Sequence, residues 1–428
     1  MELAGELLSR IARAAGWMLA QPFYYLGILA VVMQYRRQIA MERKLFHIRM
    51  HSLWSETWRT VLYGFAAGLA ASVVMAFIGA TVPMEAVFLV WAIMVVLSLV
   101  RFRFLCLSYA FGIIGLLHEL FVRIPALGES AGLQWLAHAV VPLHVPSLLA
   151  VAGVLHVAEA VLLRRQGARS ATPLFVAGKR GKPVGGYHIR GFWPVPLLLL
   201  VPSGSLGGTE SALPWATLFG GDLWQSGWMF LPFPVVLGYT GRTVSLLPEA
   251  KARQSSSGLF VYSVALMLSA AAAFVWPMLT AGASLLAIVL HEVIVRYGNW
   301  RESQQSPLYV HPEHGLTVLA VIPKSPADEM GLSAGEVIRK VNGMAVRSKE
   351  ELHQALRVNS AFCKLEVMNH EGQSKFVQRA LFAGDHHQLG VILAPDDDAP
   401  YFAESAHRGL FGMLNARRSG VQTRTKSL

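Results

Sequence analysis

Residues 325–346 read SPADEMGLSAGEVIRKVNGMAV and predict several small elements in quick succession. Ser325 suits the N-cap of a helix, Pro326 its first turn, and Gly331 the left-handed residue that ends it. A strand then leads into Asn342-Gly343, the strongest short signal of a β-hairpin. The stretch therefore predicts a short capped helix, a strand and a tight turn.

The residues on either side complete a small α+β pattern. Residues 317–322 (TVLAVI) form a β-branched, strand-like run ahead of the capped helix. Ser348 and Glu351 have the spacing of a capping box, which predicts that a further helix begins there. Two more strands are expected at 362–368 and 375–381, joined by a polar turn.

This order of elements resembles a bacterial PDZ domain. The chain follows the usual wording SPA…AGL…GD.I..VNG, with Glu336 where the family more often has Asp. Domains of this kind bind an extended peptide by adding it to a sheet edge. PDZ domains of the site-2-protease type are circularly permuted and finish with an LG(V/I) strand, which the residues LGVIL at 389–393 match.

The resemblance implies a peptide groove between the strand 389–393 and the helix 349–358. Gly390 lacks a Cβ and permits close approach of a carboxylate or main chain, so a bulky residue there is expected to block binding while sparing the fold. Two alternatives stay open: Gly315-Leu316 as the carboxylate loop, or a closing core strand whose groove is unused. The predicted groove residues are Leu389, Gly390, Val391, Ile392, Lys349, His353 and Leu356.

The rest of the chain has the composition of an α-helical polytopic membrane domain. Of 428 residues, 54% are hydrophobic and 15% charged, and the mean hydropathy is +0.45; soluble domains carry about 25% charged residues. Runs of 38 and 29 uncharged residues precede Glu292 and Glu159, and a helical span needs about 20. We expect seven to nine spans after an amphipathic helix at 1–15, because the first segment and the pair at 192–241 are short or broken by proline and could be re-entrant. The predicted segments are 16–35, 60–80, 83–100, 104–122, 146–163, 192–204, 228–241, 259–277 and 278–295.

The net charge of +11 is distributed as the positive-inside rule requires, so it does not indicate nucleic-acid binding. Eighteen Lys and Arg residues lie in the loops 36–59, 101–103, 164–190 and 242–253, whereas the opposite loops hold essentially Arg123 alone. The basic loops and everything after 296 are therefore expected in the cytoplasm, with 164–190 a flexible loop. We expect three parts: a polytopic domain (1–296), a PDZ domain (297–395) and an amphipathic, basic, partly disordered tail (396–428).

Catalytic motifs fail on their context. His291-Glu292 and His118-Glu119 each lack the second histidine of a zinc-protease H-E-x-x-H motif, and the predicted topology places these two pairs at opposite faces. His156 and Glu159 are spaced as on a metal-binding helix, but we interpret them as polar contacts. Glu159 remains a candidate because ionisable groups inside spans are functional by default. The two cysteines, Cys106 and Cys363, form no metal-type pair, so we expect no enzyme activity, metal or cofactor.

A second resemblance extends over most of the chain. Two stretches carry it. The first is ERKLFHIR at 42–49, and the second runs from PLF at 173–175 to GG at 185–186 and is followed by FWPVP at 192–196. Together with a C-terminal PDZ domain and no protease motif, these stretches make the chain similar to the MinJ family, division-site factors of Gram-positive rods.

That resemblance implies a non-enzymatic adaptor in the cell membrane, enriched at the septum and poles. The scaffold DivIVA would draw it to curved membrane, and it would recruit the division inhibitor MinD with its partner MinC. Two alternatives stay open. One is a non-catalytic PDZ component of regulated membrane proteolysis. The other is a transporter with a regulatory PDZ domain, which would gain support if Glu159 and the broken segments at 192–241 lined a cavity.

Overall fold

The computed structural model describes residues 2–399, except 101–103, 105, 180, 203–212, 214, 220–226, 360, 381–388 and 398. The helical spans expected outside the 192–241 region are all present as helices. The long helices are α1 (Glu2–Ala20), α2 (Pro22–Phe46), α3 (Leu53–Ile78), α4 (Met84–Val100), α5 (Leu107–Arg123), α8 (Val145–Gln166), α9 (Pro248–Val275) and α10 (Thr280–Gln304). The short ones are α6 (Pro125–Gly128), α7 (Gln134–Val140) and the 3-10 turn η3 (Pro277–Leu279).

Fewer helices than expected have the length of a membrane span. Within the described residues, α3, α8, α9 and the η3–α10 unit are long and apolar enough to cross a membrane. A fifth span is possible if α1 and α2, bent by 57° at Gln21, count as one. The apolar helices α4 and α5 have 17 residues each, somewhat less than a span of about 20.

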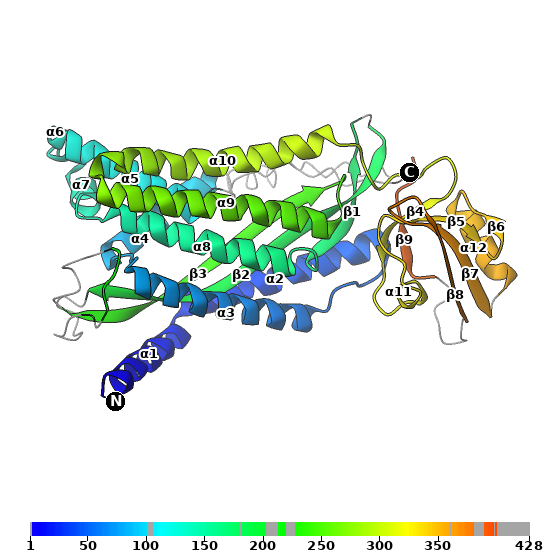
Figure 1. The fold of residues 1–428 in the computed structure, drawn as a ribbon, viewed down its shortest axis with the longest axis horizontal. Coiled ribbons are helices and arrows are strands. Elements are labelled where there is room, and N and C mark those ends of the chain that lie inside the picture. The colour runs from blue at the N-terminus through cyan, green and yellow to red at the C-terminus, as the bar shows by residue number, and fades with distance from the viewer. Residues whose placement is uncertain are drawn as a thin grey trace.

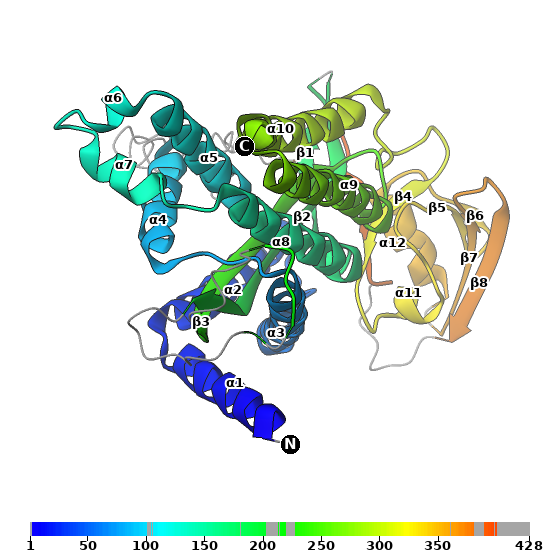
Figure 2. The same cartoon turned by 60° about the vertical axis from the view of Figure 1, so that its left-hand side comes forward.

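The expectation of spans at 192–204 and 228–241 is wrong, because the described residues of both segments lie in β-strands. β1 (Ala171–Ala177), β2 (Pro183–Pro202) and β3 (Trp228–Thr243) form an antiparallel sheet in that order. The expectation of a flexible loop at 164–190 is wrong for the same reason, since most of it is the buried β1–β2 hairpin. β2 and β3 run between α2 and α3 on one side and α8 and α9 on the other (Figures 1 and 2).

Alternate prolines define the free edges of the β2–β3 pair. Pro194 and Pro196 lie two residues apart on β2, Pro232 and Pro234 lie two residues apart on β3, and Pro196 lies opposite Pro234. All four prolines therefore belong to alternate pairs of the ladder, in which the backbone groups turn away from the partner strand. Each proline therefore removes an N–H that would have needed a partner at an edge inside the apolar interior.

Helix α3 covers the β2 edge with small residues at a four-residue spacing. A Cβ at Gly64 would collide with the carbonyl oxygen of Pro194, and one at Gly68 with that of Pro196. One turn further on, the Ser72 hydroxyl accepts a hydrogen bond of 2.8 Å from the backbone N–H of Leu198. Four helical residues rise about 6 Å and two strand residues about 6.6 Å, so the two spacings remain in step.

Polar side chains from α1, α2 and the break between them reach carbonyl groups of the same strand pair. Arg10 donates to the Trp228 carbonyl at 3.1 Å, Gln21 to that of Pro232 at 3.2 Å and Gln34 to that of Arg190 at 3.2 Å. These residues replace the water that would solvate strand edges elsewhere, and they hold the N-terminal helices against the sheet.

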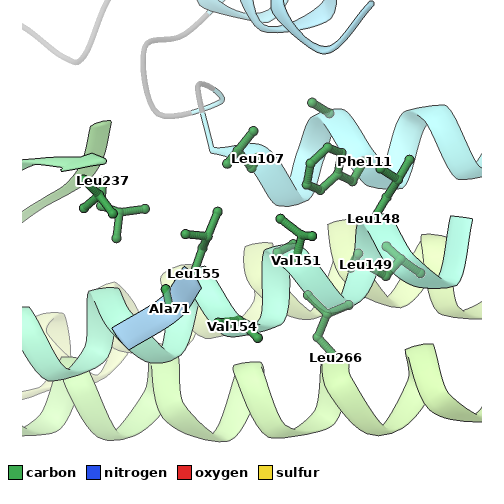
Figure 3. Close-up of a cluster of buried hydrophobic side chains, with 14 of the residues drawn as sticks. Ala71, Leu107, Phe111, Leu148, Leu149, Val151, Val154, Leu155, Leu237 and Leu266 are labelled. Atoms are coloured by element: carbon green, nitrogen blue, oxygen red, sulfur yellow. The ribbon is translucent and has the colours of Figure 1, made fainter. Parts of the chain in front are cut away.

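Helix α8 is the centre of the hydrophobic core. Leu148, Val151 and Leu155 are almost fully buried; Phe111 of α5 lies on one side of them and Leu266 of α9 on the other (Figure 3). Full burial of leucine-sized side chains stabilises a fold by about 1.5–3 kcal/mol each. The apolar stretches of α3, α9 and the η3–α10 unit are 33%, 33% and 22% buried, against 83% for α8, so these helices leave more of their apolar surface exposed.

The C-terminal part has the elements expected from its sequence. β4 (Leu316–Val321), α11 (Pro326–Glu329), β5 (Val337–Val341), β6 (Met344–Ala345), α12 (Lys349–Val358), β7 (Phe362–Met368), β8 (Ser374–Ala380) and β9 (Val391–Leu393) follow one another. The sheet order is β8-β7-β5-β4-β9, with β6 paired to β5. The Ser325 and Ser348 hydroxyls cap α11 and α12 as predicted. The predicted tail at 396–428 lies almost wholly outside the described residues.

Candidate functional site

The edge strand β9 has an open side, which faces away from β4. The Ile322 N–H donates to the Gly390 carbonyl at 2.9 Å, and the Ala394 N–H donates to the Thr317 carbonyl at 2.9 Å. Because backbone groups alternate along an antiparallel strand, Val391 and Leu393 turn theirs away from β4. Strand β9 ends the described sheet, so a peptide strand could pair with those two residues.

Helix α12 supplies the other predicted wall. Leu356 is buried in the same hydrophobic cluster as Leu389, and half-buried Val391 packs against that cluster. His353 is exposed, one turn N-terminal to Leu356. The ammonium group of Lys349 forms an ion pair of 2.9 Å with Asp396, just beyond β9. This exposed pair adds little stability but joins the first turn of α12 to the end of the strand.

Gly390 is required by the fold itself. Its φ angle is +83°, a conformation that L side chains adopt with strain. A Cβ there would collide with the Ser325 side chain, and the Gly390 carbonyl also lies 3.4 Å from the Ser325 hydroxyl. The expectation that a bulky residue at 390 spares the fold is therefore wrong, because it would push apart β9 and the N-cap of α11.

Ile392 is the predicted groove residue whose side chain points elsewhere. It is buried in the large cluster of the helical part, together with Leu319 and Ala320 of β4. Leu393 instead belongs to the cluster under α12. Successive side chains of a strand point to opposite faces, so Val391 and Leu393 face α12 while Ile392 faces the helical part.

The PDZ-like part docks on the β1–β2 hairpin through that second face, as Figure 1 shows. The Tyr187 hydroxyl donates to the Leu319 carbonyl, and the Gly185 N–H donates to the Tyr309 carbonyl at 3.0 Å. Lys182, at the hairpin turn, pairs with Asp397 at 2.5 Å. The stretch 173–186 that carried part of the second resemblance thus forms the platform for the C-terminal part.

Glu42, the first residue of the other stretch of that resemblance (42–49), forms a buried ion pair with His51 beside the same platform. The His51 Nδ1 donates to Glu42 at 2.5 Å and its Nε2 donates to the Arg169 carbonyl at 2.9 Å. Both acceptors lack protons, so both ring nitrogens carry one. Burial lowers the pKa of His51, but the hydrogen bond and negative charge of Glu42 outweigh this effect and raise the pKa above its ordinary value.

The structure keeps His118 away from His291, as the predicted topology requires, but it brings His156 to His291, which the sequence did not predict. His118 stands apart, with its ring bonded to the Val140 carbonyl at 3.2 Å. His156 and His291 come together, with ring centroids 5.5 Å apart. Glu159 lies 3.9 Å from His156. Sequence spacing missed the third member of this group, Cys106, whose sulfur is 3.1 Å from the His156 Nε2.

The fold and the edge strand define a PDZ domain at the C-terminal end of a helical protein with several apolar helices. The family model described as PDZ domain matches residues 317–365. The chain is MinJ-like: it is 28% identical over 396 residues to the "Cell division topological determinant MinJ" of Bacillus subtilis (strain 168), covering 90% of this chain and 96% of that protein.

Two further relatives are similar to a shorter part of the chain. Proteins named "Probable cell division topological determinant MinJ" from Lacticaseibacillus paracasei and Lacticaseibacillus casei (strain BD-II) are each 26% identical over 264 residues. Each alignment covers 60% of this chain and 68% of the relative. No solved structure matches the chain.

Proposed function

We propose that the chain is a non-enzymatic membrane adaptor that helps to select the division site. It would be a polytopic domain (1–296) in the cell membrane, with the PDZ domain (297–395), the basic tail (396–428) and the basic loops in the cytoplasm. The similarity to a cell division topological determinant over 90% of the chain is the observation that carries the proposal. The matched family and relatives are named for a PDZ domain and for division, not for a reaction.

The groove between β9 and α12 is the proposed partner site. An incoming peptide would pair with the outward N–H and C=O groups of Val391 and Leu393. The apolar cluster around Leu356 would accept a side chain of the peptide, and His353 would influence which side chain is preferred. The partners we propose are a DivIVA-like scaffold at curved membrane and a MinD-like ATPase with MinC.

A transporter is less well supported by the fold. That alternative required interrupted helices at 192–241 whose half-helix ends bind a substrate. The described parts of that segment include two long strands, β2 and β3, whose edges are covered by α3 and by side chains of α1 and α2.

The test is a pair of proline substitutions at the two edges of one sheet. Val391→Pro removes an N–H on the open side of β9 without touching the β4 ladder, and proline is tolerated on edge strands. Phe376→Pro is the matched control: Phe376 is 66% exposed on β8 and lies opposite Glu366 in a pair whose backbone groups point away from β7.

Both variants are expected at normal levels in the membrane. We expect Val391→Pro to abolish co-localisation of the scaffold and the inhibitor with the chain, and Phe376→Pro to leave it intact. Unchanged recruitment by a well-folded Val391→Pro protein would assign partner binding to the helical part or the basic loops.

A further inference from the structure

Three metal-ligand side chains from distant parts of the sequence meet inside the helical part. Cys106 is the N-cap residue of α5, and His156 and His291 lie near the middle of α8 and α10. The Cys106 Sγ is 3.1 Å from the His156 Nε2 and 3.8 Å from the His291 Nε2. All three atoms lie within 4.8 Å of one another.

Close helix packing holds the three residues at this spacing. A Cβ at Gly112 of α5 would lie 2.6 Å from the Ile288 Cγ1 and 2.9 Å from the Ser284 carbonyl, both on α10. The two antiparallel helices are therefore in backbone-to-side-chain contact one to two turns from the cluster. Such contact leaves little freedom to separate Cys106 from His291.

The hydrogen bonds of the two rings leave both Nε2 atoms unprotonated. The His156 Nδ1–H donates to the Ala152 carbonyl at 2.8 Å. The Tyr109 hydroxyl donates to Glu292 at 3.1 Å and accepts from the His291 Nδ1–H at 3.0 Å. In neutral imidazoles the Nε2 atoms then carry lone pairs, and both face the Cys106 sulfur.

A thiol alone does not satisfy this arrangement. Cys106 has one proton and can donate it to one imidazole, which leaves the other lone pair directed at the sulfur. A cation bound between the three atoms satisfies both rings and the thiolate together. Hydrogen bonding of the far ring nitrogen to a carbonyl or a carboxylate-linked group is also how metal-binding histidines are oriented in proteins.

We propose that Cys106, His156 and His291 bind a Zn²⁺ ion. Zinc takes nitrogen and sulfur ligands at about 2.0–2.3 Å in tetrahedral geometry, which places sulfur and nitrogen about 3.6 Å apart and two nitrogens about 3.4 Å apart. The observed sulfur–nitrogen separations of 3.1 and 3.8 Å lie on either side of that value. This proposal replaces the sequence-based expectation that the chain holds no metal.

The surrounding charge suits a divalent ion in an apolar interior. A buried charge is costly unless it is paired. The thiolate of Cys106 and the carboxylate of Glu159, 3.9 Å from the His156 Nε2, together balance the two positive charges of zinc. Binding releases the thiol proton to solvent. The ion would join α5, α8 and α10, and it would add to the hydrogen bonds that Tyr109 of α5 makes with His291 and Glu292 of α10.

The test is the zinc content of the full-length chain purified in detergent and dialysed against metal-free buffer. About one zinc per chain is expected for the wild type. Cys106→Ser, His156→Gln and His291→Gln should each lose it, whereas Cys363→Ser should keep it. Cys363 is the matched control because it is a buried thiol in the PDZ domain, where burial raises its pKa to about 11.

Cobalt replacement separates metal ligation from a folding defect. Co²⁺ added to the wild type should give a sulfur-to-cobalt charge-transfer band that Cys106→Ser lacks. Cys106→His should bind the metal without that band, and Tyr109→Phe should bind zinc about tenfold more weakly. A monodisperse wild-type protein that takes up no zinc or cobalt would overturn the proposal, as would uptake unchanged in Cys106→Ser.

Discussion

Replacement of Gly68 by alanine tests whether α3 packs directly on the backbone of β2. The added Cβ would collide with the Pro196 carbonyl oxygen and lie 2.9 Å from the Pro196 Cδ. Overpacking of this kind costs about 1–3 kcal/mol. Stretching of the adjacent hydrogen bond from Leu198 to Ser72 adds up to about 1 kcal/mol, and the better helix propensity of alanine returns about 0.5–1 kcal/mol. We expect a net destabilisation of about 1–3 kcal/mol.

The matched control is Gly282→Ala in α10, where the new Cβ would meet no atom within 4 Å. This variant gains the helix propensity without a collision and should be slightly more stable than the wild type. Thermal unfolding of the detergent-solubilised chain, followed by size-exclusion chromatography, compares the two. A Tm of Gly68→Ala equal to or above that of Gly282→Ala would refute the packing of α3 on β2.

Three further results are expected. Since the pKa of His51 is raised, the stabilisation of the fold by its ion pair with Glu42 is complete below the ordinary pKa of 6.5 and is lost as the pH rises through the higher folded value. The Tm difference between the wild type and Glu42→Gln should therefore shrink above pH 6.5, and a constant or growing difference would contradict the pair. Gly390→Trp should lower the Tm and the protein level by collision with Ser325; normal stability would contradict that contact. In a Cys106→Ser background, Lys182→Cys should resist an impermeant thiol reagent in intact cells and react after permeabilisation. Labelling of this variant in intact cells would place the β1–β2 turn outside the cytoplasm and contradict the proposed topology.

The PDZ elements could be predicted because their signals are local. The Asn342-Gly343 turn and the caps at Ser325 and Ser348 depend on residues within four positions of one another. The strand at the end of the domain, packed beside the helix 349–358, also followed from the family resemblance. The orientation of Ile392 did not, because it depends on docking against the β1–β2 hairpin.

The strands β2 and β3 were missed because both are apolar along most of their length; β2 is buried almost throughout, whereas β3 is buried only in part. A strand buried on both faces reads as a continuous apolar run, and periodicity alone cannot distinguish it from a helix. One usable signal was present: prolines at alternate positions, 194 and 196, then 232 and 234. That spacing suits a strand edge, where each proline removes an N–H on the same side, and it does not suit a helix interior.

The cysteine–histidine cluster has no sequence signature at all. Cys106 is separated from His156 by 50 residues and from His291 by 185. A search for i, i+4 histidines finds only ligands that share one helix. The cluster depends on the packing of α5, α8 and α10, which no local pattern encodes.

The most direct test of the proposed adaptor function is the position of a full-length fluorescent fusion in dividing cells. The similarity to cell division topological determinants predicts enrichment at the septum and at the new poles. The enrichment should appear as septation begins and should precede arrival of the MinD-like partner. A uniform signal around the cell membrane, from a fusion present at normal levels, would contradict the proposed function.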